Sequence, residues 1–506
     1  MIRLYIVLLL LLSALPANAQ LHPAEGDSLH YRLVPFSFVG MAKADSYVVT
    51  VANGIYNTND SFAVNIVASA KAKTNSSIIT LPSFGSGYTW RVTMYIKGVA
   101  VKQGALNHFS VKVLPNPGVG SMRLTVTHND GVYKDALMFL DHNRALYDMN
   151  GALVWFMPTL EGQNENMVVR DMKMTPRGTI SFLSETRAFE INYNGKILWQ
   201  APNDGKVNGE KTERYHHEFT RLGNGRYMLL GNKTMWCRMP AKSGELPQPT
   251  TLKVRPDSSG KDYRRIEFSS VIEYDSAGKI IWSWKLWDHF NKSHFDQFAK
   301  LQGRNEYEMH INSFYFDERA KMLYLSSKNY GIIIKIKYPQ GDVVGIYGTP
   351  YDTTGAKNND TLFCSQHAVR KSEKGYLYLF NNNACNSEEG PKVLLFKEPA
   401  SRKDTIKKVW EYSCFMNEAN RNHQMRDNVT TGGSAYELPG GEMFISLCSP
   451  YANISIVNRN KQVLWSAIPE QWNAPENKWL LLPQYRASII TDAKAIALMV
   501  GGGIKH

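Results

Sequence analysis

One sequence pattern occurs six times between residues 145 and 465, and it constrains the fold more than any other feature. Each copy has alternating apolar residues, a polar turn that usually contains Gly or Asn, and a second apolar stretch that ends in an aromatic residue. Alternation on both sides of such a turn predicts a β-hairpin. The closing aromatic residues are Trp155, Trp199, Trp282, Tyr347, Trp410 and Trp465.

A second family of hairpins lies between the copies of the first. Two hairpins per repeat give four strands, and a repeat of about 40–60 residues with four strands is typical of a β-propeller. The last hairpin of the second family, from Tyr485, has no partner after it, and the hairpin from Ala145 has none before it. Joining these two would complete a sixth blade, so we expect an all-β, six-bladed propeller. A β-sandwich would contain similar strands but not six matched pairs. The hairpins of the second family begin near Asp171, His217, Asn312, Gln366, Gly433 and Tyr485.

The rest of the chain predicts two further parts. Residues 1–19 have a basic residue, Arg3, an apolar run and the small residues Ala17-Asn18-Ala19, the pattern of a secretory signal peptide. We therefore expect a periplasmic protein. Residues 20–130 alternate in short stretches, the last of them Met122–Thr127, and predict a small β-sandwich before a propeller at 131–506. No later apolar run approaches the length of a membrane span, which argues against a multispanning protein.

Composition narrows the class of partner. The chain has 43% hydrophobic and 20% charged residues, which is typical of a globular protein, and a formal net charge of +13. In an exported protein this charge favours small anionic substrates or an acidic cell surface over nucleic acid, although a solvated basic surface explains it equally well. A homodimer is one of the oligomeric states that the sequence leaves open.

The five cysteines form no CxxC pair, which argues against a structural zinc site. Cys364 and Cys385 lie just before and just after one predicted hairpin, whose ends lie side by side, so we expect a disulfide between them. The alternatives are a Cys414–Cys448 bridge and unpaired thiols.

The innermost strands of a propeller line its channel, and their first residues gather at one mouth. Hairpin pairing would add Lys328 beside His310, and Asn381–Asn383 beside His367. Imidazoles near neutral pH act as nucleophiles, bases or donors. Arginine, lysine and asparagine donors can hold a tetrahedral anion. Alignment of the inner hairpins by their turns places at this mouth Arg170, His217, His310 with Asn312, His367, Gly433 with Ser434, and Arg486.

Other chemistries are less favoured at this mouth. No group of Asp or Glu residues is expected there, which argues against a hard-metal site or a two-carboxylate glycosidase. Three histidines could bind zinc, or could each be hydrogen-bonded structural residues. Their convergence from three blades favours a functional site, for which no cofactor is expected.

These motifs resemble the bacterial arylsulfate sulfotransferase family, which is independent of 3′-phosphoadenylyl sulfate. The resemblance covers about residues 135 to 500. Its motifs are His216-His217-Glu218-Phe219, His310-Ile311-Asn312-Ser313, Gln366-His367, Gly433-Ser434-Ala435 and Tyr485-Arg486-Ala487.

The resemblance implies ping-pong transfer of a sulfuryl group from an aryl sulfate to a phenol. His367 would be the nucleophile and carry the group as a sulfohistidine. His310 with Asn312 would bind the sulfate or assist the leaving phenolate, and His217 would bind the sulfate or move protons. The chain departs from the family's pattern by having Lys328 where Arg is usual, and Glu218 and Ala368 where Asp is usual.

Two other functions are compatible with the same residues. A non-catalytic periplasmic propeller could bind an anionic or sulfated ligand in the basic cup. A histidine-rich lyase or hydrolase could use a metal.

Overall fold

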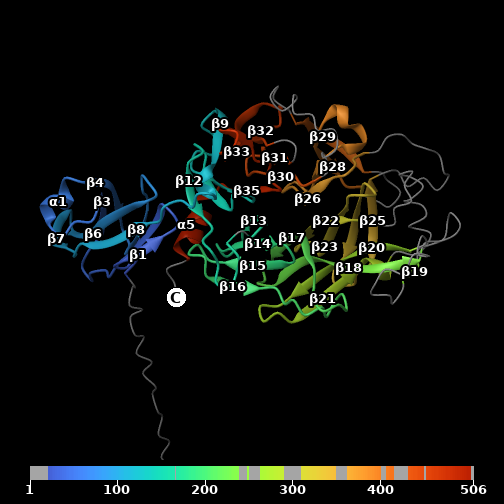
Figure 1. Cartoon of the computed structure of the whole chain (residues 1–506), viewed down its shortest axis with the longest axis horizontal. Coiled ribbons are helices and arrows are strands. Elements are labelled where there is room, and N and C mark those ends of the chain that lie inside the picture. Colours follow the sequence, from blue (N-terminus) through green and yellow to red (C-terminus); the bar gives the residue numbers. More distant parts are fainter. Residues whose placement is uncertain are drawn as a thin grey trace, which may run out of the picture. The chain divides into compact units, whose positions relative to one another are not determined.

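The protein is described by a computed structural model over residues 21–165, 167–238, 248–249, 263–289, 309–348, 362–399, 406–414, 431–448 and 452–502. The structure is all-β, as expected, with many four-stranded sheets (Figure 1). The chain forms two compact units, one up to Val113 and the other from Leu114 to Gly503. None of the helices in the described part of the chain is long and apolar enough to cross a membrane.

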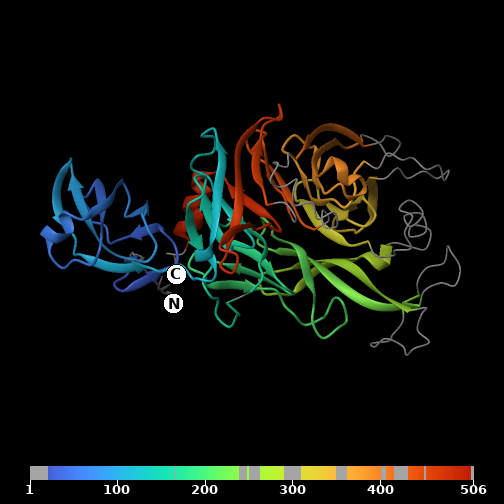
Figure 2. The same cartoon turned by 45° about the horizontal axis from the view of Figure 1, so that its top comes forward.

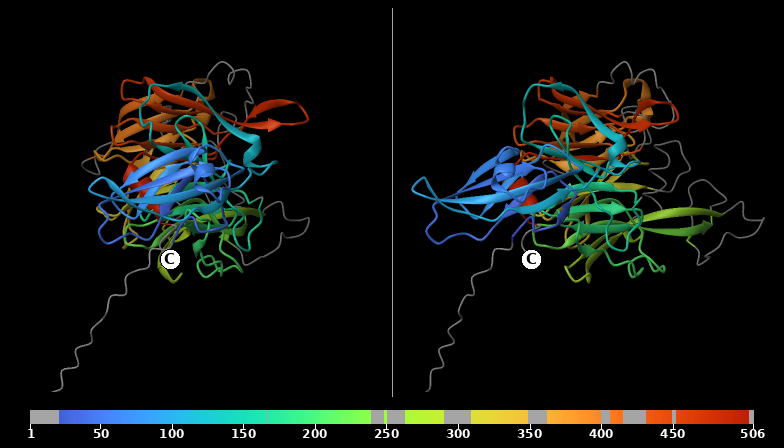
Figure 3. Two further views of the ribbon diagram at one scale, coloured as in Figure 1. Left: turned by 90° about the vertical axis from the view of Figure 1, so that its left-hand side faces the viewer. Right: turned by 60° about the vertical axis from the view of Figure 1, so that its left-hand side comes forward.

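The first unit has one large and one small sheet, drawn in blue in Figure 3. The large sheet has the order β1-β8-β6-β3-β4, with β7 also on β6, and the small sheet pairs β2 with β5. Phe36 of β2 packs against Trp90 of β6, with ring centroids 5.1 Å apart. The elements are β1 (Asp27–Leu29), β2 (Leu33–Ser37), β3 (Ser46–Asn53), α1 (Asn59–Ala63), β4 (Ile66–Ala72), β5 (Ser76–Thr80), β6 (Ser86–Ile96), β7 (Val99–Gln103) and β8 (Asn107–Val111).

In the described residues the second unit has six sheets built on four strands each, and the predicted hairpins of both families appear in them except the one from Tyr485. The first three sheets are β10 (Leu137–Leu140), β11 (Ala145–Asp148), β12 (Leu153–Phe156) with β35 (Ala487–Ile490); β13 (Arg170–Met174), β14 (Ile180–Ser184), β15 (Arg187–Ile191), β16 (Ile197–Gln200); and β17 (Tyr215–Arg221), β18 (Tyr227–Arg238), β20 (Tyr263–Tyr274), β21 (Ile280–Lys285), with β19 (Gln248–Pro249) beside β18.

The other three sheets follow in chain order. They are β22 (Ile311–Asp317), β23 (Met322–Ser327), β24 (Ile332–Lys337), β25 (Val343–Gly348); β26 (His367–Lys371), β27 (Leu377–Asn381), β28 (Lys392–Lys397), β29 (Lys407–Ser413); and β30 (Ser434–Glu437), β31 (Met443–Ser446), β32 (Ile454–Val457), β33 (Val463–Asn473), extended by β34 (Lys478–Leu481) and by β9 (Met122–Asn129). The short helices are η1 (Val119–Ser121), α2 (Leu286–His289), η3 (Ala384–Glu389) and α5 (Ala493–Gly501).

Contacts run from each of these sheets to the next. They link β35 to β13, β14 to β17, β17 to β22, β22 to β26, β26 to β30, and β31 back to β35. In Figure 1 the labelled strands β13, β17, β22, β26, β30 and β35 accordingly lie around the middle of this unit, which Figure 2 shows from a second direction.

The repeated aromatic residues explain part of this arrangement. The indole nitrogen of each of four closing tryptophans donates to a backbone carbonyl in the outer hairpin of the next sheet. Such bonds run from Trp155 to Tyr193 at 2.8 Å, from Trp282 to Pro339 at 2.8 Å, from Trp410 to Arg459 at 2.9 Å, and from Trp465 of the sixth sheet to Met149 of the first at 2.9 Å. The aromatic position thus ties neighbouring sheets together and joins the last sheet to the first.

The first sheet is closed differently from the prediction. We expected a hairpin from Tyr485 to supply two strands, but only β35 is a strand, and it pairs with β10. Residues 493–501 form α5 instead, because Asp492 caps the helix by accepting from the Lys494 N–H and because three of its nine residues are Ala, the strongest helix former. The sheet therefore takes three strands from the start of this unit and one from its end.

The expected boundary at residues 130 and 131 also differs from the structure. Residues Met122–Asn129 form β9, which pairs antiparallel with β33 of the sixth sheet rather than with strands of the first unit. The compact units accordingly divide before β9, at Val113. Alternation alone cannot reveal this, because it predicts a strand but not its partner.

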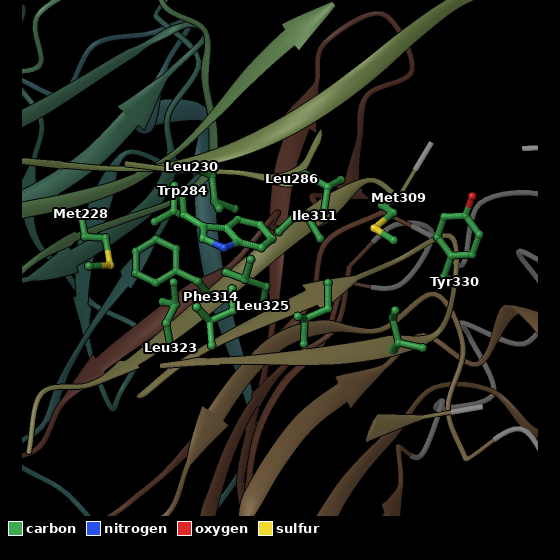
Figure 4. Close-up of a cluster of buried hydrophobic side chains, with 14 of the residues drawn as sticks. Met228, Leu230, Trp284, Leu286, Met309, Ile311, Phe314, Leu323, Leu325 and Tyr330 are labelled. Carbon is green, nitrogen blue, oxygen red and sulfur yellow. The ribbon is translucent and has the colours of Figure 1, made fainter. Parts of the chain in front are cut away.

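A buried cluster between the third and fourth sheets supports the site described below. Figure 4 shows Trp284 of β21 lying near Phe314 of β22, and the same cluster includes Met309 and Ile311. These two residues flank His310, so the backbone that carries His310 is held by close packing.

Candidate active site

Irregular backbone at the start of the inner strands presents the candidate site residues. Pairing shifts register between Tyr215 and Phe219 in β17, and between His367 and Arg370 in β26. Left-handed φ values accompany these shifts, 60° at His217 and 54° at Ala368, and His310 just before β22 has 49°. Bulges of this kind redirect side chains and are frequent beside active sites.

The structure brings the three predicted histidines together. His217 Nε2 lies 3.0 Å from His310 Nε2, so one of the two nitrogens donates and the other accepts. The ring centroids of His217 and His367 are 6.5 Å apart. The pKa of His217 is held well below its usual value, first by burial and then by the neighbouring histidines and Arg486. His217 is therefore neutral at physiological pH.

His367 is buried and has a defined set of partners. Its Nδ1 lies 2.7 Å from Asn382 Oδ1 and 3.1 Å from the Ser365 carbonyl oxygen, and both of these atoms can only accept. Its Nε2 accepts from the Gly432 N–H at 3.3 Å. The pKa of His367 is lowered to about 3, mainly by burial and in part by the positive charges of Lys328 and Arg486, while the hydrogen bond to Asn382 acts in the opposite direction. The ring is therefore neutral, with the proton on Nδ1 and the lone pair on Nε2.

Asn312 and Lys328 lie where the hairpin argument placed them. The Lys328 N–H donates to the His310 carbonyl oxygen at 3.1 Å, which confirms the predicted pairing. The Asn312 amide donates to the Gln366 carbonyl oxygen at 2.7 Å, and its Oδ1 is buried without a partner in the described part of the chain. A buried unpaired amide oxygen is costly unless a ligand or water satisfies it, so Asn312 can take part in binding.

Arg486 lies in a buried ion network. Its guanidinium donates to Asp171 at 2.8 Å, to Glu218 at 2.7 Å and to the Asn312 carbonyl oxygen at 3.1 Å. Glu218 also accepts from Arg370 at 2.9 Å and from Lys173 at 2.8 Å. The two carboxylates and three cations leave one positive charge in excess. Arg486 thus acts on the histidines through its charge while its terminal nitrogens are already bonded within the protein.

Two carboxylates therefore do converge near the histidines, contrary to our expectation from the sequence. Both carboxylates are ion-paired with the arginine and lysine side chains described above. In the described residues no group of three or more His, Cys, Asp or Glu side chains is placed to hold a metal ion. The surrounding cations lower the pKa of Glu218 far below its usual value, although burial acts in the opposite direction.

Arg170 is exposed and lies over an aromatic residue. Its guanidinium carbon is 5.3 Å from the ring centroid of Tyr485, which in turn stacks on His217 with centroids 6.0 Å apart. The Tyr485 hydroxyl is buried without a partner among the described residues, and burial raises its pKa to about 12. We did not assign Tyr485 from the sequence, although its place beside Arg486 at the predicted mouth was a usable signal.

The disulfide predicted between Cys364 and Cys385 is present, with Cα atoms 6.1 Å apart. It anchors the segment that leads into His367. The rival pair, Cys414 and Cys448, consists of two buried free thiols. Asn382 is a further residue to which sequence reasoning gave no role beyond its position near His367.

Comparison with known proteins gives one informative match. A family model described as arylsulfotransferase (ASST) matches residues 124–415. No curated protein matches the chain. A protein of unknown function from Bacteroides caccae is 12% identical, covers 74% of this chain and 100% of its own, and has a TM-score of 0.38. An auxiliary nutrient binding protein from Bacteroides thetaiotaomicron is 10% identical, covers 88% and 84%, and has a TM-score of 0.32. Similarity at this level supports no conclusion about function.

Proposed function

The chain belongs to the arylsulfotransferase family, and from this we propose that it transfers a sulfuryl group from an aryl sulfate ester to a phenolic acceptor through a sulfohistidine at His367. The observation that carries the proposal is the state of His367, a neutral ring with its lone pair on Nε2. The ring lies close to the His217–His310 pair and within the field of Lys328 and Arg486. We further propose that the six sheets are the blades of one propeller, that the first unit is a β-sandwich, and that the protein acts in the periplasm.

In the first half of the reaction, His367 Nε2 would attack the sulfur of the donor. The nitrogen–sulfur bond forms as the bond from sulfur to the aryl oxygen breaks, and the electron pair leaves on the phenolate. The ammonium of Lys328 and a ring N–H of the histidine pair would stabilise that negative charge. Asn312 Oδ1 can only accept a hydrogen bond, so it cannot bind the sulfate oxygens. Its expected partner is a hydrogen-bond donor such as the hydroxyl of the second phenol.

In the second half, the acceptor phenol would bind where the first phenolate left. Its hydroxyl gives a proton to the His217–His310 pair while its oxygen attacks sulfur. The sulfur–nitrogen bond breaks, and its electron pair returns to His367 Nε2. The pair then passes the proton to solvent, so the enzyme is unchanged over one cycle. The first half consumes the neutral Nδ1–H tautomer of His367, and the second half regenerates it.

The test is incubation of the protein with an aryl sulfate that carries labelled sulfur. We expect label to stay on the wild-type protein and to leave when a phenol is added. His367→Asn should fold and retain no label, whereas His30→Asn, at a buried histidine of the first unit, should behave as wild type. Label retained by His367→Asn would exclude the proposed nucleophile. Donor binding without any retained label would instead favour the non-catalytic, anion-binding alternative.

A further inference from the structure

We propose that Asn382 is a positioning residue that fixes the tautomer of His367 and thereby aims its Nε2 lone pair at the sulfur. This inference rests on the proposed role of His367 as nucleophile. Asn382 is fully buried, and its Oδ1 lies 2.7 Å from His367 Nδ1. An amide oxygen can only accept, so this contact requires the proton on Nδ1.

The orientation of the Asn382 amide is itself determined by its surroundings. Its Nδ2 donates to the Gly432 carbonyl oxygen at 3.0 Å and to Cys448 Sγ at 3.4 Å. Both hydrogens of the amide nitrogen are thus used. A reversed amide would set Oδ1 against the Gly432 carbonyl oxygen and present N–H to His367 Nδ1. That arrangement would favour the other tautomer, in which the proton occupies the nitrogen that must attack.

Gly432 holds the opposite side of the same ring. Its N–H donates to His367 Nε2 at 3.3 Å, while its carbonyl oxygen accepts from Asn382. Gly432 has a φ of 75°, and a Cβ there would lie 2.6 Å from the Tyr485 carbonyl oxygen, so this position requires glycine. The Gly432 N–H therefore favours the same tautomer as Asn382, because it donates to the unprotonated Nε2 on the opposite side of the ring.

The same contact has a second consequence once sulfur is bound. When Nε2 forms the bond to sulfur, the ring becomes cationic while Nδ1 keeps its proton. Asn382 Oδ1 then accepts a charge-assisted hydrogen bond, which is stronger than the neutral one. Asn382 would thus stabilise the intermediate without touching the substrate. The Ser365 carbonyl oxygen at 3.1 Å is a weaker second acceptor for Nδ1, so removal of Asn382 should slow the enzyme without abolishing its activity.

The experiment compares Asn382→Leu, Asn382→Asp and a matched control, Asn383→Asp. The control places the same charge at the next buried asparagine, whose amide donates to the Gly390 carbonyl oxygen. We expect Asn382→Leu to lower the rate of single-turnover labelling about 10- to 100-fold, the usual cost of losing an orienting partner. The KM for the aryl sulfate should change by less than about threefold, because Asn382 does not reach the substrate.

Asn382→Asp keeps the acceptor and adds a negative charge. The carboxylate favours the imidazolium form of His367. The acid limb of the pH profile of kcat/KM should therefore lie at higher pH than in wild type and in Asn383→Asp. Among the described residues, the other charged or titratable groups that act on His367 are Lys328, Arg486, His310 and His217, and they are unchanged in all three variants. Measurement of this limb does not require the leucine variant to fold.

The outcomes separate the two proposals. Wild-type labelling rates in both Asn382 variants, with an acid limb no different from that of Asn383→Asp, would overturn the role of Asn382. If His367→Asn still acquires label, the proposed function itself fails, whatever the Asn382 variants do. A shifted acid limb in Asn382→Asp together with an inactive His367→Asn supports both.

Discussion

The buried ion network makes a quantitative prediction that distinguishes two roles of Arg486. As a substrate-binding residue, Arg486 would affect KM when replaced. As the structure places it, the side chain is 1% exposed and its ion-pair partners Asp171 and Glu218 are equally buried. Removal of one partner from a buried ion pair costs about 3–5 kcal/mol, because the other charge remains buried and uncompensated. We therefore expect Arg486→Met to lower the free energy of unfolding by about that amount.

A double-mutant cycle isolates the interaction. Glu218→Gln alone leaves Arg370, Lys173 and Arg486 with one carboxylate fewer, and should destabilise the protein by a similar amount. The double variant removes one charge of each sign. Its loss of unfolding free energy should therefore be smaller than the sum of the losses in the two single variants, by about 2 kcal/mol or more.

The assay is urea unfolding of the full chain, followed by tryptophan fluorescence and by circular dichroism. Arg170→Met is the matched control, because Arg170 is an exposed arginine near the same histidines, and its stability should stay within about 0.5 kcal/mol of wild type. Additive losses in the cycle, or an Arg486→Met protein of wild-type stability with a raised KM, would refute this reasoning.

Three further predictions follow from the site. Lys328→Met should lower kcat/KM by the equivalent of about 2–4 kcal/mol of lost transition-state stabilisation, whereas Lys328→Arg should maintain or raise the rate. Steady-state kinetics on one aryl sulfate measure both variants, and an unaffected methionine variant would place Lys328 outside the site. Replacing both Cys364 and Cys385 by alanine should lower the free energy of unfolding by about 3 kcal/mol, because the bridge closes a loop with a sequence separation of 21, and an unchanged urea midpoint would contradict this. The pKa of His216 and of His367 is lowered to about 3 by burial, so below pH 6.5 the unfolded chain binds protons that the folded chain does not. Stability should therefore fall from pH 7 to pH 5, and less steeply in His367→Asn; equal slopes in the two proteins would argue against a depressed pKa at His367.

The sequence alone determined the local units of this protein. Alternating apolar residues around polar turns specified the hairpins of both families, because a strand's period and its turn are set by residues close together in the chain. The same argument placed Lys328 beside His310 and Cys364 beside Cys385, since each pair flanks one hairpin. Residue type together with family resemblance identified the three histidines that the structure brings together.

Alternation misassigned two segments for a physical reason. It does not distinguish a strand from a helix in a short, mostly apolar segment such as α5. It also does not say which sheet a strand joins, so β9 was assigned to the first unit although it pairs with β33.

Only the tertiary structure decided which charges and hydrogen-bonding groups meet. Arg486 pairs with Asp171 across 315 residues of sequence, and Glu218 meets Arg370 across 152. Asn382 reaches His367 because both belong to one hairpin, but the direction of its amide depends on Gly432 and Cys448, which lie beyond that hairpin. A side chain's charge and hydrogen-bonding capacity can be read from its type. Whether it faces a substrate or a buried partner depends on which residues the packing of separate sheets places within about 3 Å of it.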